Sequence, residues 1–116
     1  MTNFLNGPAA GVALELARSP LFLRVVSGAD GVWDALDLLA DGPRDSEAVH
    51  AYRREGDAGA VHLDYTESRT GRRRGRDIAY AEYRVVAVQP DDATMRDSAA
   101  WRAWCQAQAA TERGGS

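Results

Sequence analysis

Residues 60–88 read AVHLDYTESRTGRRRGRDIAYAEYRVVAV, two strand-like segments on either side of an arginine-rich run. Residues 60–66 alternate apolar and polar side chains, and residues 78–88 form the longest strand-like segment of the chain, which Gln89-Pro90 ends. Such alternation and such β-branched and aromatic content are typical of β-strands. The glycines and charges between the two segments favour a loop. This stretch therefore predicts two antiparallel strands joined by a protruding loop, residues 67–77.

Two further strands are expected before this stretch. Residues 12–17 alternate, and residues 21–26 are apolar on nearly both faces apart from Arg24, so the two are expected to pair as a hairpin around residues 18–20. The apolar residues of segment 32–39 match neither the helical repeat nor the alternation of a strand throughout. A strand through about Ala35, running into a turn or a short helical loop, is favoured there over a helix.

A second hairpin is expected in the middle of the chain. Residues 48–54 and 60–66 both resemble strands, and they flank the glycine-rich segment 55–59. Two short strands around such a segment are typical of a hairpin.

The hydrophobic period changes near the C-terminus. Residues 99–111 are dominated by helix formers, with Asp97 or Ser98 as an N-cap and Gly114-Gly115 as a stop. The side chains that recur at i, i+3, i+4 and i+7 form a stripe that should pack on the sheet: Trp101, Trp104, Cys105 and Gln108.

The expected fold class is therefore α+β, with a mostly antiparallel sheet of five to six strands and one C-terminal helix packed on it. Residues 1–112 are expected to form a single domain, because 116 residues suffice for one hydrophobic core and not for two. Residues 113–116 are expected to be a flexible tail.

Charge is distributed unevenly along the chain. The whole protein carries a net charge of −3, whereas residues 66–77 carry five arginines against Glu67 and Asp77. A local reversal of sign on an acidic domain indicates a site for anionic ligands. The acidic balance of the remainder makes long nucleic acid a less favoured partner than a compact anion. The acidic segment 30–47 is a natural partner for the arginine run, within one subunit or between subunits.

Seven side chains make up the candidate ligand-binding site. Guanidinium groups bind phosphate oxygens bidentately, and glycines let a ligand approach the backbone closely. Two tyrosines flank the loop and are expected to meet near its base, where they would stack on a nucleotide base. The site comprises Tyr65, Arg69, Arg72, Arg73, Arg74, Arg76 and Tyr80.

Explanations without a ligand stay open for both the arginines and the tyrosines. Every basic residue is arginine and alanine is abundant, a composition typical of high-GC coding, so the run is also explained as a solvated hairpin tip. The tyrosines are also explained by ordinary cross-strand packing.

His50 and His62 form a second candidate cluster. In the expected hairpin they share one side with Tyr52 and Asp64, a composition suited to a metal site or an acid–base pair. No zinc-type spacing accompanies them. A surface pair without a metal is therefore favoured, and no cofactor is expected. Cys105 is interpreted as a small buried hydrophobe in a reducing compartment.

Targeting signals are not expected. The N-terminus has no secretory pattern, and the longest apolar stretch, residues 20–26, is interrupted by Arg24, so no membrane span is expected.

The chain resembles small accessory proteins from phages and prophages of high-GC bacteria. The residues that carry this resemblance are residues 4–9, 21–26 and 33–37, Ala79, Glu82, Tyr83 and residues 101–105. It implies a compact accessory protein, often an inhibitor of a bacterial defence system, and it transfers no functional residues. With the single cysteine and the missing secretory pattern, a cytoplasmic location in the bacterial host cell is expected.

Three functions follow as hypotheses. The first is a non-enzymatic, homo-oligomeric anti-defence protein that sequesters a nucleotide signal or another phosphorylated ligand. The second is a module that docks the same loop on a host defence protein, such as a nuclease or CRISPR-type complex, or on nucleic acid. The third and least favoured is a small hydrolase that uses His50 or His62 with Asp64.

Overall fold

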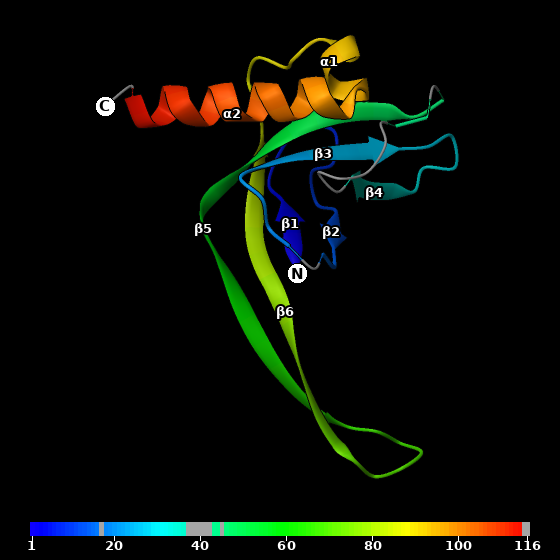
Figure 1. The fold of residues 1–116 in the computed structure, drawn as a ribbon. Coiled ribbons are helices and arrows are strands. Elements are labelled where there is room, and N and C mark those ends of the chain that lie inside the picture. The colour runs from blue at the N-terminus through cyan, green and yellow to red at the C-terminus, as the bar shows by residue number, and fades with distance from the viewer. Residues whose placement is uncertain (17, 37–42, 45, 115–116) are drawn as a thin grey trace.

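A curled, mostly antiparallel sheet forms the centre of the molecule, and two helices cover one of its faces (Figure 1). The computed structural model describes residues 1–16, 18–36, 43–44 and 46–114. Its strands are β1 (Thr2–Phe4), β2 (Ala13–Leu14), β3 (Phe22–Ser27), β4 (Trp33–Leu36), β5 (Ala48–Thr66) and β6 (Arg73–Val85), and its helices are α1 (Asp92–Arg96) and α2 (Ser98–Gly114). The predicted α+β class, the antiparallel character of the sheet and the C-terminal helix are confirmed.

The strand order is β2-β1-β6-β5-β3-β4. All neighbours are antiparallel except β1 and β6, which run parallel with Thr2 opposite Ala81. The short strand β1 is not predicted from the sequence because three residues carry no usable period. It forms because the main chain of β6 binds it, through Ala81 N to Met1 O (3.2 Å) and Leu5 N to Tyr83 O (2.9 Å).

The predicted hairpin of residues 12–17 with 21–26 is wrong. Strand β2 covers two residues and pairs with β1, whereas β3 pairs with β4 and β5. The alternation itself has a structural basis, since Val12, Leu14 and Leu16 all pack against the buried core. Periodicity identified the buried face but carried no information about which strand lies alongside.

The predicted hairpin of residues 48–54 with 60–66 is also wrong. Both segments belong to the single strand β5, which has a register shift between Glu55 and Gly59. Strand β6 is long enough to pair with both halves, so neither half needs the other. Gly56, at φ +69°, lies in this irregular stretch rather than in a turn.

The predicted strand through Ala35 and the predicted C-terminal helix are confirmed, and α2 continues to Gly114. Asp97 caps α2 by accepting from Ala100 N at 2.9 Å. The short helix α1 was not predicted. Asp91 caps it, because its Oδ1 accepts from Thr94 N at 2.8 Å. The end of the predicted tail, residues 115–116, lies outside the described residues.

Both faces of the sheet are buried around β3, whose side chains alternate between two cores. Under the helices lie Phe22, Val26, Val49, Ala51, Met95 and Trp101. On the other face lie Phe4, Ala9, Leu23, Val25, Tyr52, Ala81 and Tyr83. This is why residues 21–26 are apolar on nearly both faces.

The exception, Arg24, is fully buried on the helix side. Its Nη1 donates to Met95 O at 3.0 Å, and its guanidinium lies 5.5 Å from the centre of the Trp101 ring. Among the described helices, none is long and apolar enough to cross a bilayer.

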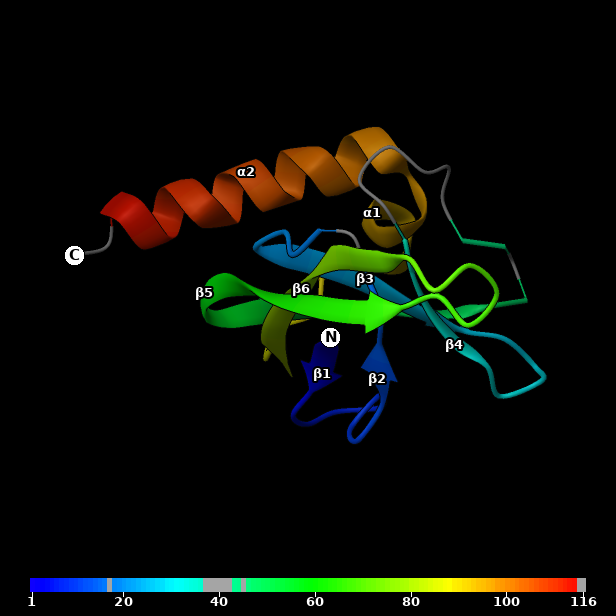
Figure 2. The same ribbon diagram turned by 90° about the horizontal axis from the view of Figure 1, so that it is seen from below.

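Beyond the register shift, β5 and β6 leave the body of the molecule together as a two-stranded ribbon (Figures 1 and 2). The longest dimension of the molecule is 50 Å, and the ribbon projects away from the helix layer. The arginine-rich run lies at the end of this ribbon.

Candidate functional site

The ribbon of residues 59–80, which we call the arm, carries all seven predicted site residues. Its strands pair without interruption from Gly59 opposite Tyr80 to Thr66 opposite Arg73. The predicted loop is too long, because β6 begins at Arg73 and only residues 67–72 form the turn. Gly75 and the charges around it suggested a loop, but cross-strand pairing with β5 outweighs the low strand propensity of these residues.

Glu67 organises the turn. Its main-chain oxygen accepts from Gly71 N at 2.9 Å, and its N–H donates to Arg72 O at 2.9 Å. Its carboxylate accepts from Thr70 Oγ1 at 2.8 Å and lies 3.3 Å from Arg74 Nε. Gly71 adopts φ +66°, a conformation that glycine takes at little cost. The tip is therefore an ordered turn.

The pairing register sorts the predicted site residues onto two faces, because directly opposite residues of an antiparallel pair share a face. Tyr65 lies opposite Arg74 and Leu63 lies opposite Arg76. The surface on this side, which we call the aromatic face, consists of Leu63, Tyr65, Arg74, Arg76, Ile78 and Tyr80. Arg73 faces the other way, opposite Thr66, and Arg69 and Arg72 lie in the turn.

The two tyrosines do not meet near the base of the turn, as the sequence had suggested. Tyr65 lies opposite Arg74, and Tyr80 lies six residues further along β6. At about 3.3 Å per residue, the positions of the two rings are about 20 Å apart. Both side chains are exposed, Tyr65 at 46% and Tyr80 at 42%. The aromatic face is thus an open platform.

On the opposite face of the arm, His62 lies between two carboxylates. Its Nδ1 is 2.7 Å from Asp77 Oδ1, the residue opposite it, and its Nε2 is 3.0 Å from Asp64 Oδ1. Gly75 makes room for the ring, since a Cβ at that position would come within 2.5 Å of His62 Nε2.

A neutral imidazole has one N–H and cannot donate to both carboxylates at once. The geometry therefore favours the imidazolium form. Hydrogen bonds that the ring donates to Asp77 and Asp64 correspondingly raise the pKa of His62. Because the carboxylates bind the two ring nitrogens from different sides, they do not converge on a common point. Among the described residues, no group of three His, Cys, Asp or Glu is arranged to hold a metal ion.

The expected pairing of His50 with His62 is wrong. Both lie on β5, twelve residues apart, and His50 belongs to the body, opposite Val25 and with its ring 6.2 Å from that of Trp33. Burial lowers the pKa of His50. Of the two predicted acid–base pairs, only that of His62 with Asp64 is in contact, and both nitrogens of that imidazole are already engaged by carboxylates.

The arginines of the arm differ in their partners. Arg74 pairs with Glu67, and Arg76 pairs with Glu15 of the N-terminal segment. Within the described part of the chain, the side chains of Arg69, Arg72 and Arg73 form no ion pair and are exposed. The tip thus presents guanidinium groups to solvent.

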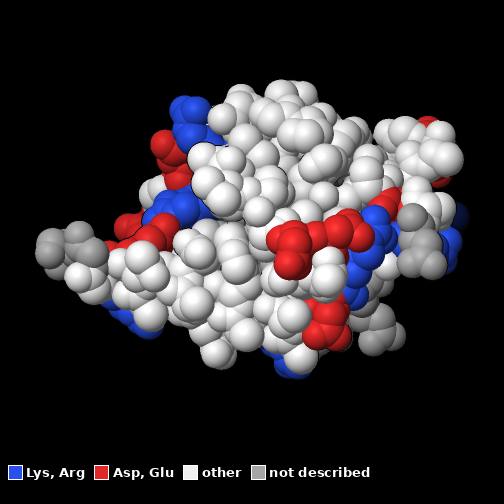
Figure 3. Space-filling model, turned by 90° about the horizontal axis from the view of Figure 1, so that it is seen from above, with Lys and Arg blue, Asp and Glu red and all other residues white. Residues whose placement is uncertain are grey.

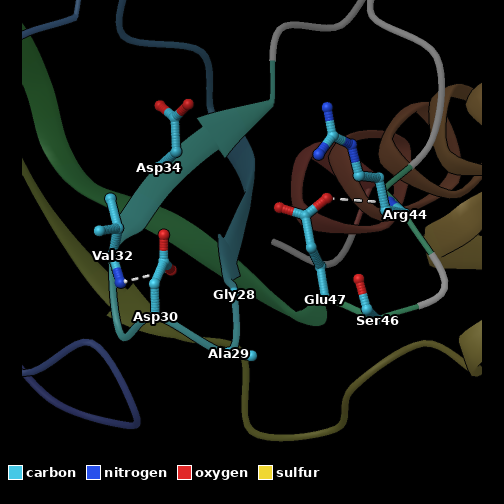
Figure 4. A pocket seen from close by; sticks show the side chains of 8 residues that line it. All are labelled: Gly28, Ala29, Asp30, Val32, Asp34, Arg44, Ser46 and Glu47. Carbon is cyan, nitrogen blue, oxygen red and sulfur yellow. Dashed lines mark hydrogen bonds between the residues drawn. The ribbon is translucent and has the colours of Figure 1, made fainter.

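Among the described residues, no side chain of the acidic segment 30–47 pairs with the arginine run, whose carboxylate partners are Glu67 and Glu15. Asp37, Asp41 and Asp45 fall outside the described residues. Asp30, Asp34 and Glu47 line an open hollow of about 420 Å³ together with Arg44 (Figure 4). Two of its carboxylates bind main-chain amides, Asp30 that of Val32 (3.1 Å) and Glu47 that of Arg44 (2.9 Å).

A second hollow, of about 360 Å³, was not anticipated from the sequence. It lies where β5 and β6 bend beneath the end of α2 and is lined by Arg53, Arg54 and Arg84. Glu112 binds Arg53 bidentately at 2.5 and 2.9 Å, and Glu55 pairs with Arg84. Each of these lining arginines already binds a carboxylate or a carbonyl, as Arg54 does with Gly56 O at 3.0 Å. Neither hollow is lined by residues of the arm.

Viewed from the helix side, the surface is largely uncharged, with small acidic and basic groups side by side in both halves of the view (Figure 3). That face offers no extended field of one sign. Within the described ranges, the arm is where exposed arginines without an ion-pair partner and exposed tyrosine rings occur together.

Comparison with known proteins yields no match to a family model, a curated protein or a solved structure.

Proposed function

We propose that the protein is a non-enzymatic binding module whose arm takes a ligand that carries both phosphates and aromatic bases. The observation that supports this most is the register of β5 and β6, which aligns Tyr65, Arg74, Arg76 and Tyr80 on one exposed face. Exposed aromatic rings beside guanidinium groups are the means by which proteins hold unpaired nucleic-acid strands.

The spacing on this face favours a short single strand over a mononucleotide. Two tyrosines about 20 Å apart stack on different bases of one strand. The arginines between them meet its phosphates in exchange for their carboxylate partners, Glu67 and Glu15. Arg69, Arg72 and Arg73 add charge around the tip. Each stacked base contributes about 1–3 kcal/mol, so two stacks and a few phosphate contacts suffice for measurable affinity.

Sequestration of a nucleotide signal, in the anti-defence role that the resemblance implies, stays a proposal that uses the same side chains. It requires a compact ligand to bind on an open platform. A long polynucleotide, in turn, meets the acidic body, which carries a net negative charge outside residues 66–77. The short strand avoids both difficulties.

The test is fluorescence anisotropy with a labelled oligothymidylate over a series of salt concentrations, beside thermal shift with mononucleotides and cyclic dinucleotides. We expect oligonucleotide binding to weaken with salt, with a slope of about −0.7 in log–log form for each phosphate contacted. The double variant Arg72→Ala/Arg73→Ala should lower that slope and reduce affinity about tenfold or more.

The matched control is Arg102→Ala/Arg113→Ala, which removes the same charge from exposed positions on α2. If both double variants weaken binding equally, the effect is one of net charge and the arm is not the site. Salt-insensitive, stoichiometric binding of a mononucleotide would instead support the sequestration hypothesis. If neither ligand class binds the wild-type protein, the proposal is wrong.

A further inference from the structure

The outer edge of the arm strand β5 lacks a neighbour. Strand β3 pairs with β5 only from Ala48 to Arg53, and beyond the register shift residues 59–66 pair with β6 alone in the described part of the chain. An isolated two-stranded ribbon is marginally stable in water, and an unpaired strand edge is a template for another strand. The arm therefore has backbone groups available for one more strand on its β5 side.

We propose that this edge pairs with the same edge of a second copy of the chain, antiparallel and centred on Leu63. In that register Leu63 lies opposite its own copy, and His62 lies opposite Asp64 of the partner subunit. By symmetry the contact between His62 and Asp64 occurs twice. The two arms then form one four-stranded sheet.

The side chains select this register. Directly opposite residues share a face. The register of the self-paired strands can therefore shift only in steps that keep Leu63 and Tyr65 on one face and His62 and Asp64 on the other. Centring on Asp64 places two carboxylates opposite each other, and centring on His62 places two imidazolium-prone rings opposite each other. Only the intermediate register, centred on Leu63, sets opposite charges against each other on one face and a leucine pair on the other.

The apolar side chains that this register brings together are exposed in the single chain. Leu63 is 44% exposed and Tyr65 next to it on the same face is 46% exposed. Pairing brings two copies of each onto one continuous surface, which buries part of their apolar area. On the other face, Asp77 and Asp64 of the same chain already engage both ring nitrogens of His62, at 2.7 and 3.0 Å. The partner's Asp64 therefore meets the charge of an imidazolium that is held in place, and not a free N–H.

The experiment is a charge exchange between two variants, followed by sedimentation velocity and native mass spectrometry. His62→Asp alone sets carboxylates against Asp64 of the partner, and Asp64→Lys alone sets ammonium groups against His62 of the partner. Each variant alone should self-associate about tenfold more weakly than the wild type, because both symmetric contacts become repulsive. Mixed together, the two variants should form heterodimers, in which both contacts are again between opposite charges.

Folding of each variant is checked by far-UV circular dichroism, and recovery of the heterodimer shows independently that both chains are competent. Arg72→Ala, in the turn and outside the paired edge, serves as the control that should leave the dimer unchanged. The proposal is overturned if the wild type stays monomeric at the highest soluble concentration. It is also overturned if the single variants dimerise like the wild type, or if mixing them gives no heterodimer.

Discussion

Gly7 shows how one residue fixes the N-terminal strands against the sheet. It adopts φ +73°, and a Cβ there would lie 2.8 Å from Val85 Cβ and 2.9 Å from Tyr52 Oη. That hydroxyl is itself engaged, accepting from Ala9 N at 2.8 Å and donating to Asn6 O at 2.9 Å. We expect Gly7→Ala to lower the free energy of unfolding by about 3 kcal/mol, through backbone strain and overpacking together.

Gly11 separates these two causes. It adopts φ +82° in the same turn, but a Cβ there meets nothing within 4 Å. Gly11→Ala should therefore cost only the backbone term, about 1 kcal/mol. Urea denaturation of both variants measures the difference, and equal losses would show that the packing of Gly7 against Val85 is unimportant.

The two histidines are expected to titrate on opposite sides of the ordinary value of 6.5. Hydrogen bonds that the ring donates to Asp77 and Asp64 raise the pKa of His62, while burial lowers the pKa of His50. NMR titration of the two ring signals measures both values in one experiment. Asp77→Asn should move the midpoint of His62 down and leave that of His50 in place. A His62 midpoint below 6.5 would contradict the clamped geometry.

The same shift makes the arm sensitive to pH. A folded-state pKa above 6.5 means that the contribution of His62 to stability is fully present below pH 6.5 and is lost as the pH rises through the raised value. Amide hydrogen exchange in residues 59–80, corrected for its intrinsic pH dependence, should therefore be slower at pH 6 than at pH 8. The control is Gly75→Ala, whose Cβ displaces the His62 ring and should remove this pH dependence.

At the scale of elements, Arg96 of α1 connects the helix layer to the segment that precedes β5. It donates to Arg44 O and Glu47 O, both at 2.8 Å, and its Nε donates to Asp92 Oδ2 at 2.8 Å. We expect Arg96→Ala to cost about 2 kcal/mol in thermal or urea unfolding, because two carbonyls lose charged donors. Arg102→Ala on α2, an exposed position, should stay within about 0.5 kcal/mol of the wild type.

Elements with a sustained period could be predicted from the sequence, and those made by long-range pairing could not. The stripe of Trp101, Trp104 and Cys105 predicts α2, and the run at residues 21–26 predicts β3. Strand β1 depends on β6, which lies far away in the chain, and the first half of β5 depends on the end of β6, about 30 residues further on. A glycine-rich stretch such as residues 55–59 looks the same in the sequence whether it turns the chain or holds a bulge.

The candidate site was predictable in composition and not in geometry. An arginine run between two strands indicates a charged hairpin, which the structure shows. The pairing register of β5 against β6 decides which side chains share a face. No local sequence signal sets that register along the six residues that separate Arg74 from Tyr80 on β6. Tyr65 and Tyr80 therefore seemed adjacent in the sequence argument and are about 20 Å apart along β6.

For the whole molecule, the structure separates a stabilising body from a projecting arm. Both hydrophobic cores are built from residues of the body, and none of the side chains described between residues 60 and 79 belongs to either core. Gly59 and Tyr80 lie directly opposite each other at the base of the arm. A two-residue turn joins such a pair without altering the strands on either side, and Asn-Gly is the sequence that this turn prefers.

Replacing residues 60–79 by Asn-Gly should therefore leave the body folded. We expect the free energy of unfolding to change by about 1 kcal/mol or less, because the deleted segment buries little apolar surface. The shortened protein should keep the near-UV circular dichroism that its buried tryptophan gives, and it should lose both oligonucleotide binding and self-association. Loss of the folded body would show that the arm is structural. Retention of binding would place the ligand site elsewhere, with the arginine hollow under α2 as the next candidate.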